Sequence, residues 1–307
     1  MKISGSEKSA AARPGAFLDV SERALLALQG RDAQDLLQRL STNDLSPLTI
    51  SGAIQTVLTN EKGRMIDVVS VLKLDETRLL LAGQSSRTDD LVRWLDKFII
   101  MEDAVIEPVT SAYTHFAAFN VYPRAEVWEE RADSESSRTY VEEWGGVKLL
   151  HFLVDVSRKE EIANLFSGIG LRPVERAEFE EFRVKNGIPC SPNELSDGYN
   201  PLEANLDHLI SWTKGCYIGQ EVIARLDTYR KVQRRLVKLT LTDMPEALPA
   251  TLFSERDEAG TITSAVRLPD DSSFLGLGYV RTHSLETGGN LVFRKNGNEV
   301  RAILIKG

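Results

Sequence analysis

The C-terminal part of the chain is the region whose sequence most restricts its fold. Beyond Arg235, short apolar runs follow one another, and Pro, Gly, Asp and Asn residues separate them. Short strands that reverse direction repeatedly form a small β-barrel or a sandwich. We therefore expect a separate β-unit here, in a chain of the α+β class. The runs are residues 236–241, 261–268, 274–280, 291–294 and 300–305.

The N-terminal part has the pattern of an antiparallel sheet accompanied by helices. Two apolar runs flank the turn-forming residues 60–63, which is typical of paired strands. Apolar side chains recur at helical spacing in two other segments, one of them preceded by the candidate helix cap Asp32. We predict strands at 17–20, 53–59, 65–74, 79–82 and 105–106, helices at 32–40 and 88–100, and a disordered tail at 1–13.

A second unit is predicted from residue 113 to residue 171, where strand-like and helix-like segments alternate. This alternation is typical of a ferredoxin-like α+β unit. A charged helix is then expected at 175–185, ended by Gly187 and Pro189, and a loop rich in turn formers follows at 191–201. Long loops within a compact domain are often functional. Within the second unit we predict strands at 115–119 and 147–156 and helices at 124–130 and 159–166.

The composition indicates an ordinary soluble protein. With 307 residues and 42% hydrophobic residues, the chain can form two or three domains. It contains neither an apolar stretch long enough to cross a bilayer nor a signal-like start, so a cytoplasmic location without membrane association is expected. Cys190 and Cys216 are too few to hold an iron–sulfur cluster alone, and we expect no disulfide. His115, His151 and His283 lack metal-ligand spacing, so no metal site is expected.

The segment Lys214-Gly215-Cys216-Tyr217-Ile218-Gly219-Gln220-Glu221 is the strongest candidate for chemistry. Glycines on both sides of Cys216 allow the backbone to approach a ligand closely, and a helix is expected to start near Gln220. A thiol ahead of a helix N-terminus, with Lys214 nearby, favours a reactive thiolate. The alternative is that Cys216 is a small buried hydrophobic residue.

Positive charge is concentrated around this cysteine. Between Lys214 and Lys238 there are seven basic residues against two acidic ones, in a chain of net charge −8. Such a cluster suits a ligand with several carboxylates or a nucleic-acid backbone. The alternative is a solvated basic edge strand.

These residues resemble the YgfZ family of folate-binding proteins. That family is related to the glycine cleavage T-protein, an aminomethyltransferase, and to a mitochondrial iron–sulfur assembly factor. The octapeptide around Cys216 resembles the family signature, and further blocks resemble the family in order along almost the whole chain. These blocks are residues 29–32, 40–45, 58–64 with Asp67, 188–189, 201–207, 260–265 and 277–281.

The resemblance implies a three-domain, T-protein-like fold of the α+β class with antiparallel sheets. A discontinuous folate-binding core would comprise residues 14–111 and 172–235. The ferredoxin-like unit would comprise residues 112–171, and a small C-terminal β-barrel residues 236–307. The implied ligand is tetrahydrofolate or a one-carbon derivative of it.

The resemblance also implies roles for individual residues. Glu203 would anchor the pterin, because a carboxylate can accept two parallel N–H bonds from an aminopyrimidinone edge; the alternative is an acid that stabilises a helix start. Arg225 and Arg234 would hold the glutamate-tail carboxylates. The remaining expected site residues are Tyr217 and Asn43 in cofactor binding, and Cys216, Lys214 and Asp67 in catalysis.

Two departures from the T-protein pattern bear on the activity. The T-protein has two adjacent acids where this chain has Asp67 followed by Val68, and it usually has an acid at the position of Cys216. Both departures argue against ordinary aminomethyl transfer. Asp67 could also simply cap a turn.

We interpret these features as those of an accessory protein rather than an enzyme. It would bind tetrahydrofolate and support iron–sulfur cluster assembly or repair in client enzymes, including enzymes of tRNA modification. The rival reading is a folate-dependent aminomethyltransferase or methyltransferase. A Cys216–His208 nucleophile pair would instead indicate acyl transfer or hydrolysis. Direct RNA binding is disfavoured by the net charge of −8 and by the absence of an aromatic-basic RNA-binding motif.

Overall fold

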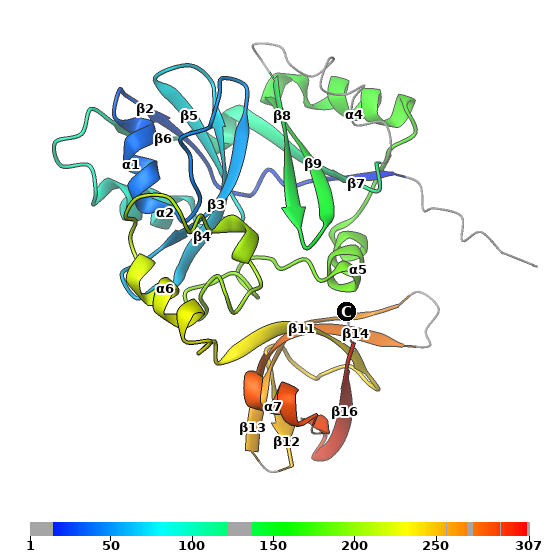
Figure 1. Cartoon of the computed structure of the whole chain (residues 1–307). Helices are drawn as coiled ribbons and strands as arrows, with labels where there is room; N and C mark the ends of the chain where they lie inside the picture. Colours follow the sequence, from blue (N-terminus) through cyan, green and yellow to red (C-terminus); the bar gives the residue numbers. More distant parts are fainter. Residues whose placement is uncertain (1–14, 122–136, 256, 269–272, 289, 306–307) are drawn as a thin grey trace, which may run out of the picture.

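The computed structural model describes residues 15–121, 137–255, 257–268, 273–288 and 290–305, whose strands form three sheets (Figure 1). Two sheets are open, with five strands each, and the third is a closed barrel of six strands. In Figure 1 the open sheets lie beside each other in the upper part of the molecule, and the barrel lies below them. The predicted α+β class with antiparallel sheets and a C-terminal barrel is therefore confirmed.

The first sheet has the strand order β3-β4-β5-β2-β6, and all its neighbouring strands are antiparallel. Its two helices bury apolar side chains at helical spacing, among them Leu36 and Leu37 of α1 and Leu91 and Leu95 of α2. These side chains join strand residues in one buried cluster, which fixes the helices on the sheet. The elements are β2 (Leu25–Gln29), α1 (Ala33–Leu40), β3 (Ala53–Thr59), β4 (Met65–Lys73), β5 (Arg78–Gly83), α2 (Thr88–Asp96) and β6 (Val105–Pro108).

The second sheet has the order β10-β1-β7-β9-β8, and only its β1–β10 pair is parallel. Phe17 of β1 lies edge-on to Phe116 of β7 and to Phe166 of α4, so aromatic packing holds the helix on the sheet. Strands β1 and β10 join this sheet from outside residues 112–171. The elements are β1 (Ala16–Asp19), η1 (Thr110–Ala112), β7 (Tyr113–Phe119), β8 (Ser137–Trp144), β9 (Val147–Asp155), η2 (Val156–Arg158), α4 (Lys159–Gly168) and β10 (Arg172–Pro173).

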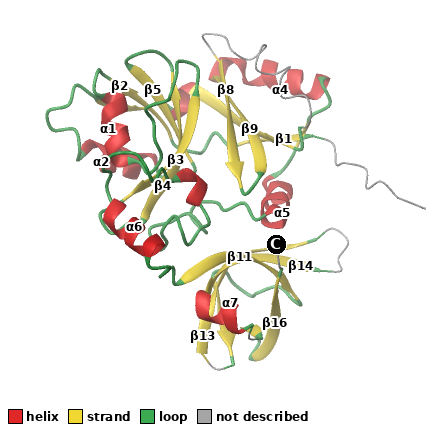
Figure 2. Cartoon of the chain, in the orientation of Figure 1, coloured by secondary structure: helices red, strands yellow, loops and turns green. Residues whose placement is uncertain are grey.

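A long loop connects α5 (Arg176–Asn186) to α6 (Gln220–Thr228), interrupted by the short helix η3 (Asp207–Leu209) (Figure 2). Gly187 ends α5 in the left-handed conformation, at φ 75°, which glycine adopts without strain. The loop carries both cysteines and Glu203, and half of the expected site residues, Glu203, Lys214, Cys216 and Tyr217, depend on how it is held.

The C-terminal barrel closes in the strand order β11-β14-β13-β12-β15-β16. Its interior is filled by alternating apolar side chains, among them Leu239, Leu252, Ile262 and Phe293. Closure leaves no open edge between its first and last strands, because β11 pairs with both β14 and β16. The elements are β11 (Arg234–Leu241), β12 (Ala250–Ser254), β13 (Asp257–Arg267), β14 (Phe274–Arg281), α7 (Thr282–Thr287), β15 (Leu291–Lys295) and β16 (Asn298–Leu304).

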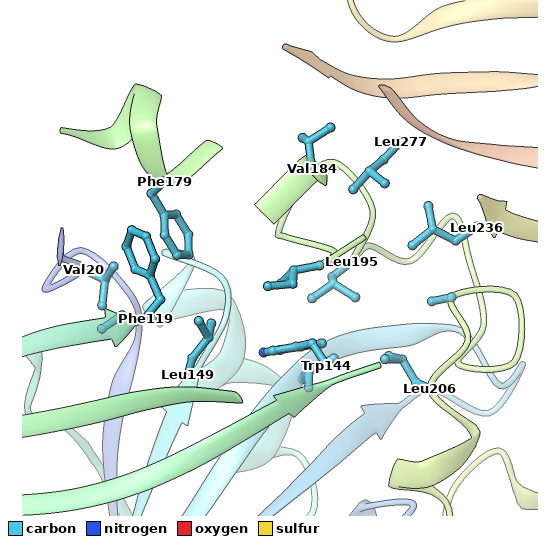
Figure 3. Close-up of a cluster of buried hydrophobic side chains, with 14 of the residues drawn as sticks. Val20, Phe119, Trp144, Leu149, Phe179, Val184, Leu195, Leu206, Leu236 and Leu277 are labelled. Atoms are coloured by element: carbon cyan, nitrogen blue, oxygen red, sulfur yellow. The ribbon is translucent and has the colours of Figure 1, made fainter. Parts of the chain in front are cut away.

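One buried cluster joins all three sheets (Figure 3). Phe119 comes from β7, Phe179 from α5, Leu195 and Leu206 from the long loop, and Leu277 from the barrel. Burial of apolar surface contributes about 25 cal/mol per Å². The cluster therefore holds the sheets and the long loop in one fixed arrangement.

Several elements differ from the sequence-based predictions. Strands β2, β8 and β12 were not predicted, and α2 ends at Asp96 although Phe98 still packs against the same cluster. Asp32 does occupy the N-cap of α1, but its carboxylate accepts the backbone N–H of Asp103 instead of capping the helix (2.8 Å). The predicted tail at 1–13 and helix at 124–130 lie outside the described residues. None of the described helices is long and apolar enough to cross a membrane.

Candidate functional site

Asp67 is a buried carboxyl group near the start of β4, with 3% of its surface exposed. Its Oδ1 accepts the backbone N–H groups of Val68 (2.8 Å), Gln84 (3.3 Å) and Ser85 (3.3 Å). Burial raises the pKa of Asp67 to about 6, because the charged form loses solvation that these amides replace only in part. At neutral pH this carboxyl can therefore accept or return a proton.

A pocket of about 380 Å³ lies against Asp67. Trp94, which is 9% exposed and otherwise belongs to the core of the first sheet, is among its lining residues. Arg87 and Arg93 both pair with Asp90, and the three basic and three acidic side chains of the lining balance when Asp67 is ionised. An acid, an aromatic ring and cations together suit a planar polar ring that carries carboxylates. The charged lining residues are Asp67, Arg87, Asp90, Arg93, Lys97 and Asp197.

Glu203 lies in the long loop and is 4% exposed. Its Oε2 accepts from the backbone N–H of Asn200 (3.0 Å) and from Nη1 of Arg64 (3.1 Å), and its Oε1 accepts from Nε of Arg234 (2.9 Å). The guanidinium of Arg234 also lies over the ring of Tyr199, 4.6 Å from its centroid. Glu203 is thus held by groups of its own chain, and Oε1 keeps the greater capacity to accept a further hydrogen bond.

Asp67 and Glu203 are connected through the segment that precedes Glu203. The backbone N–H of Met65, two residues before Asp67, donates to the carbonyl oxygen of Tyr199 (3.0 Å). Asp197, at the start of the same segment, lines the pocket of Asp67. The segment 197–203 therefore contacts the start of β4 at Tyr199, lines the Asp67 pocket at Asp197 and carries Glu203 at its end.

The side chain of Lys214 is directed at backbone carbonyls. Its Nζ donates to the carbonyl oxygens of Gln38 (2.7 Å), Ser41 (2.8 Å) and Asn43 (2.6 Å), at the C-terminal end of α1. Cations stabilise this end of a helix, where carbonyl groups lack intrahelical partners. Burial lowers the pKa of Lys214 to about 8. Lys214 thus anchors its loop to α1, and its ammonium group is engaged there instead of with the Cys216 sulfur.

Cys216 is exposed, four residues ahead of α6. The loop behind it packs on the β3–β4 turn, where Thr59 Oγ1 donates to the carbonyl oxygen of Ile218 (2.6 Å). Gly219 has φ 83°, and a Cβ there would lie 2.6 Å from the carbonyl oxygen of Asn60, so only glycine fits. The alternative of a buried, packed Cys216 is therefore wrong for this structure. Cys190 is the less accessible thiol, and burial raises its pKa to about 12.

The other expected residues take different positions. The Nδ2 of Asn43 donates to the carbonyl oxygen of Gln55 (2.9 Å), and its backbone carbonyl binds Lys214. The ring of Tyr217 is buried beside the same ammonium group, 5.5 Å from its centroid, and burial raises its pKa to about 12. Arg225 is exposed on α6, and the Glu203 cluster contains Arg64 and Arg234 instead.

The expected residues therefore form two groups. Lys214, Asn43 and Tyr217 meet at the end of α1, whereas Glu203 of the long loop pairs with Arg234 of β11. His208 does not join Cys216: it is exposed, and its Nε2 lies 3.2 Å from the carbonyl oxygen of Glu143.

Sequence reasoning missed three contributors, Arg64, Trp94 and Tyr199. Arg64 lies in a block that resembles the family, directly after Gly63, and this adjacency was the available signal. Trp94 was predicted only as an apolar residue of a helix face. Nothing in the sequence around Tyr199 indicates that Arg234 stacks on its ring.

The chain is similar to proteins of glycine cleavage. Residues 1–121 match the family model described as the GCVT N-terminal domain. An aminomethyltransferase of Aquifex aeolicus is 26% identical over 96% of this chain and 83% of its own length. An aminomethyltransferase of Desulforamulus reducens is 25% identical over 98% of this chain and 88% of its own length.

A solved structure shows the same fold. The glycine cleavage system aminomethyltransferase T of Bartonella henselae superposes with a TM-score of 0.81, at 18% sequence identity, and the match covers 95% of this chain and 85% of that one. The chain therefore has the three-part fold of the T-protein, and its sequence similarity supports a place in the GcvT-like superfamily.

Proposed function

We propose that this protein binds tetrahydrofolate, or a one-carbon derivative of it, and acts in folate-dependent one-carbon transfer of the aminomethyltransferase type. The observation that carries the proposal is the buried acid Asp67 in the wall of a pocket that also offers Trp94. The similarity to named aminomethyltransferases over almost the whole chain supports it.

The residues present fit a folate. Trp94 in the lining of the Asp67 pocket offers aromatic contact to a bicyclic ring, and Oε1 of Glu203 can accept one further N–H donor. Arg234 and the cations of the pocket wall suit the carboxylates of a glutamate tail. When bound, tetrahydrofolate supplies the nitrogen that carries the one-carbon unit.

The contribution of the chain to transfer is the handling of a proton at Asp67. With its pKa raised to about 6, Asp67 can hold a proton at its carboxyl oxygen or accept one at neutral pH. Its three backbone amide partners fix the carboxyl plane, so the proton is exchanged at a defined position. Val68 follows where the T-protein pattern has a second acid, so Asp67 alone would perform this step.

A second candidate is an accessory folate-binding protein that supports iron–sulfur clusters in client enzymes. The observation that favours it is the exposure of Cys216, because a thiol at the surface can meet a sulfur species or a cluster of a partner protein. In this candidate, folate binding occurs without turnover.

One assay separates the two candidates. The protein is supplied with tetrahydrofolate and an aminomethyl-lipoyl carrier, and the formation of methylenetetrahydrofolate is measured. The transfer proposal expects turnover that Asp67→Asn abolishes and Cys216→Ser retains. Saturable folate binding with background turnover would contradict the transfer proposal and favour the accessory role, which would then be tested with Cys216→Ser in cells by assaying iron–sulfur enzymes.

A further inference from the structure

A second pocket, of about 460 Å³, lies between the N-terminal segment, the end of β5 and the start of the long loop. Its lining includes Arg23, Gln84, Phe179, Cys190 and Pro192. The pocket is separate from the Asp67 pocket in its lining residues, and none of the expected site residues lines it.

Arg23 is the unusual group in this pocket. It is 9% exposed, and its Nη1 has no hydrogen-bond partner among the described residues. The nearest carboxylate oxygen, Oε2 of Glu142, is 3.8 Å from Nη1, which is beyond hydrogen-bonding distance. A guanidinium removed from water without hydrogen-bonded partners carries a free-energy cost that a bound anion would offset.

Glu142 does not depend on Arg23 for its hydrogen bonds. Its carboxylate accepts from Ser70 Oγ (3.3 Å), Gln84 Nε2 (2.6 Å) and Trp144 Nε1 (3.2 Å). Arg23 therefore acts on Glu142 as a neighbouring charge, which helps to lower the pKa of that carboxyl, and not as a hydrogen-bond donor. Nη1 itself is enclosed and lies at ion-pair distance from Glu142, so a ligand in the pocket would meet the other donors of this guanidinium, which form no hydrogen bond with the described residues.

The other charged groups of the lining are already matched. Glu22 pairs with Arg176 at the exposed rim, and Glu180 pairs with the buried Arg183 (2.5 Å). Arg23 is therefore the guanidinium of this lining without a hydrogen-bonded carboxylate. One such group, with a buried carboxylate 3.8 Å behind it, suits a singly charged anion better than a phosphate dianion.

We propose that this pocket binds an organic monocarboxylate through the Arg23 guanidinium. A planar guanidinium matches the two oxygens of a carboxylate, and the side chains of Phe179 and Pro192 provide an apolar surface for the body of the ligand. The carboxylate belongs either to a separate small acid or to the glutamyl group of a folate. The Arg23 guanidinium would bind the carboxylate of either molecule in the same way.

The test uses benzoate as the probe and benzamide as its uncharged match, with the full-length protein at constant ionic strength. Calorimetry should give saturable binding of benzoate, and benzamide should bind at least about tenfold more weakly. Arg23→Met removes the charge at similar length and should weaken benzoate binding at least about tenfold. The control variant Arg31→Gln, whose exposed arginine is paired with Asp103 and does not line this pocket, should leave benzoate affinity nearly unchanged.

Several results would overturn the proposal. These are equal binding of benzoate and benzamide, equal benzoate binding by wild type and Arg23→Met, no saturable benzoate binding, or tighter binding of inorganic phosphate. If circular dichroism shows that Arg23→Met is unfolded, Arg23→Lys keeps the charge but loses the planar donor pair, and its affinity should still fall. Competition between benzoate and tetrahydrofolate would identify the folate as the source of the carboxylate, and independent binding would identify a separate acid.

Discussion

The ammonium group of Lys214 lies 2.6 Å from the backbone carbonyl oxygen of Asn43, and this contact joins the cysteine-bearing loop to the end of α1. The same Nζ also binds the carbonyl oxygens of Gln38 and Ser41. One side chain thus satisfies three carbonyl groups that lie 171 to 176 residues away in the sequence. Lys214 therefore positions the loop.

Replacing Lys214 by Met should destabilise the protein. Three charge-assisted hydrogen bonds are lost, and water can replace them only in part because the site is half-buried. The free energy of unfolding should fall by about 1–3 kcal/mol, measured by urea denaturation. The exposed Lys231 is the matched control, and Lys231→Met should change stability by less than about 0.5 kcal/mol. Equal stability of both variants would contradict the anchoring role.

Asp67→Asn should change how stability depends on pH. The folded-state pKa of Asp67 is raised from 3.8 to about 6, so its contribution to stability is present below pH 3.8 and is lost as pH rises through 6. The Asp67→Asn variant cannot ionise at this position, so it does not lose stability as the pH rises through 6. Relative to wild type, its free energy of unfolding should therefore rise by about 2–3 kcal/mol between acidic and neutral pH, measured by denaturation at several pH values.

Asp75 provides the control for this pH dependence. It is a carboxylate whose pKa the backbone N–H of Thr77 and the guanidinium of Arg78 lower to about 2. Its contribution to stability is present above pH 3.8 and is lost as pH falls toward 2, so Asp75→Asn should show no gain toward neutral pH. If the difference in free energy of unfolding between wild type and Asp67→Asn does not change with pH, the pKa of Asp67 is not raised in the folded protein.

The two thiols should differ strongly in reactivity. Cys216 is exposed, whereas burial raises the pKa of Cys190 to about 12 and keeps that thiol protonated. Iodoacetamide near neutral pH should therefore alkylate Cys216 first, as measured by peptide mass spectrometry. Cys216→Ser should retain the wild-type melting temperature, because the side chain packs against little. Faster modification of Cys190, or a large loss of stability in Cys216→Ser, would contradict this assignment.

Removing the Glu203 carboxylate should weaken the long loop. In Glu203→Gln, Arg64 and Arg234 lose their common anion, although both guanidiniums are more than one third exposed and can be solvated. The expected loss of unfolding free energy is about 1–3 kcal/mol, less than for a fully buried ion pair. Glu221→Gln, on the exposed first turn of α6, is the matched control and should be nearly neutral. A neutral Glu203→Gln would mean that the ion pairs do not hold the loop.

Periodicity was sufficient to predict much of the fold. The apolar runs at residues 53–59 and 65–73, and the helical spacing of Leu36, Leu37 and Leu40, each predict their element from the local sequence. Strand β8 was missed because its sequence carries buried polar groups, among them Glu142, whose hydrogen-bond partners come from other strands and from Trp144. The hydrogen bonds that compensate for burying Glu142 form only in the folded chain, so the local sequence does not predict them.

The candidate site could be predicted only in part for the same reason. The octapeptide around Cys216 predicts an exposed loop before a helix, and the structure has that arrangement. The partner of Lys214 could not be predicted, because proximity in sequence favours Cys216 whereas the folded chain brings the end of α1 to the ammonium group. Nor does the sequence indicate that Arg64, from the first sheet, would share Glu203 with Arg234.

The most direct test of the proposed function is a calorimetric titration with tetrahydrofolate under anaerobic conditions, using wild type, Glu203→Gln and Glu221→Gln. Wild type and Glu221→Gln should show the same saturable binding. Glu203→Gln should bind at least about tenfold more weakly, because a charge-assisted acceptor for the pterin edge is lost. Absence of saturable binding to the folded wild-type protein would contradict the claim that this chain binds folate, and unchanged affinity in folded Glu203→Gln would remove Glu203 from the site.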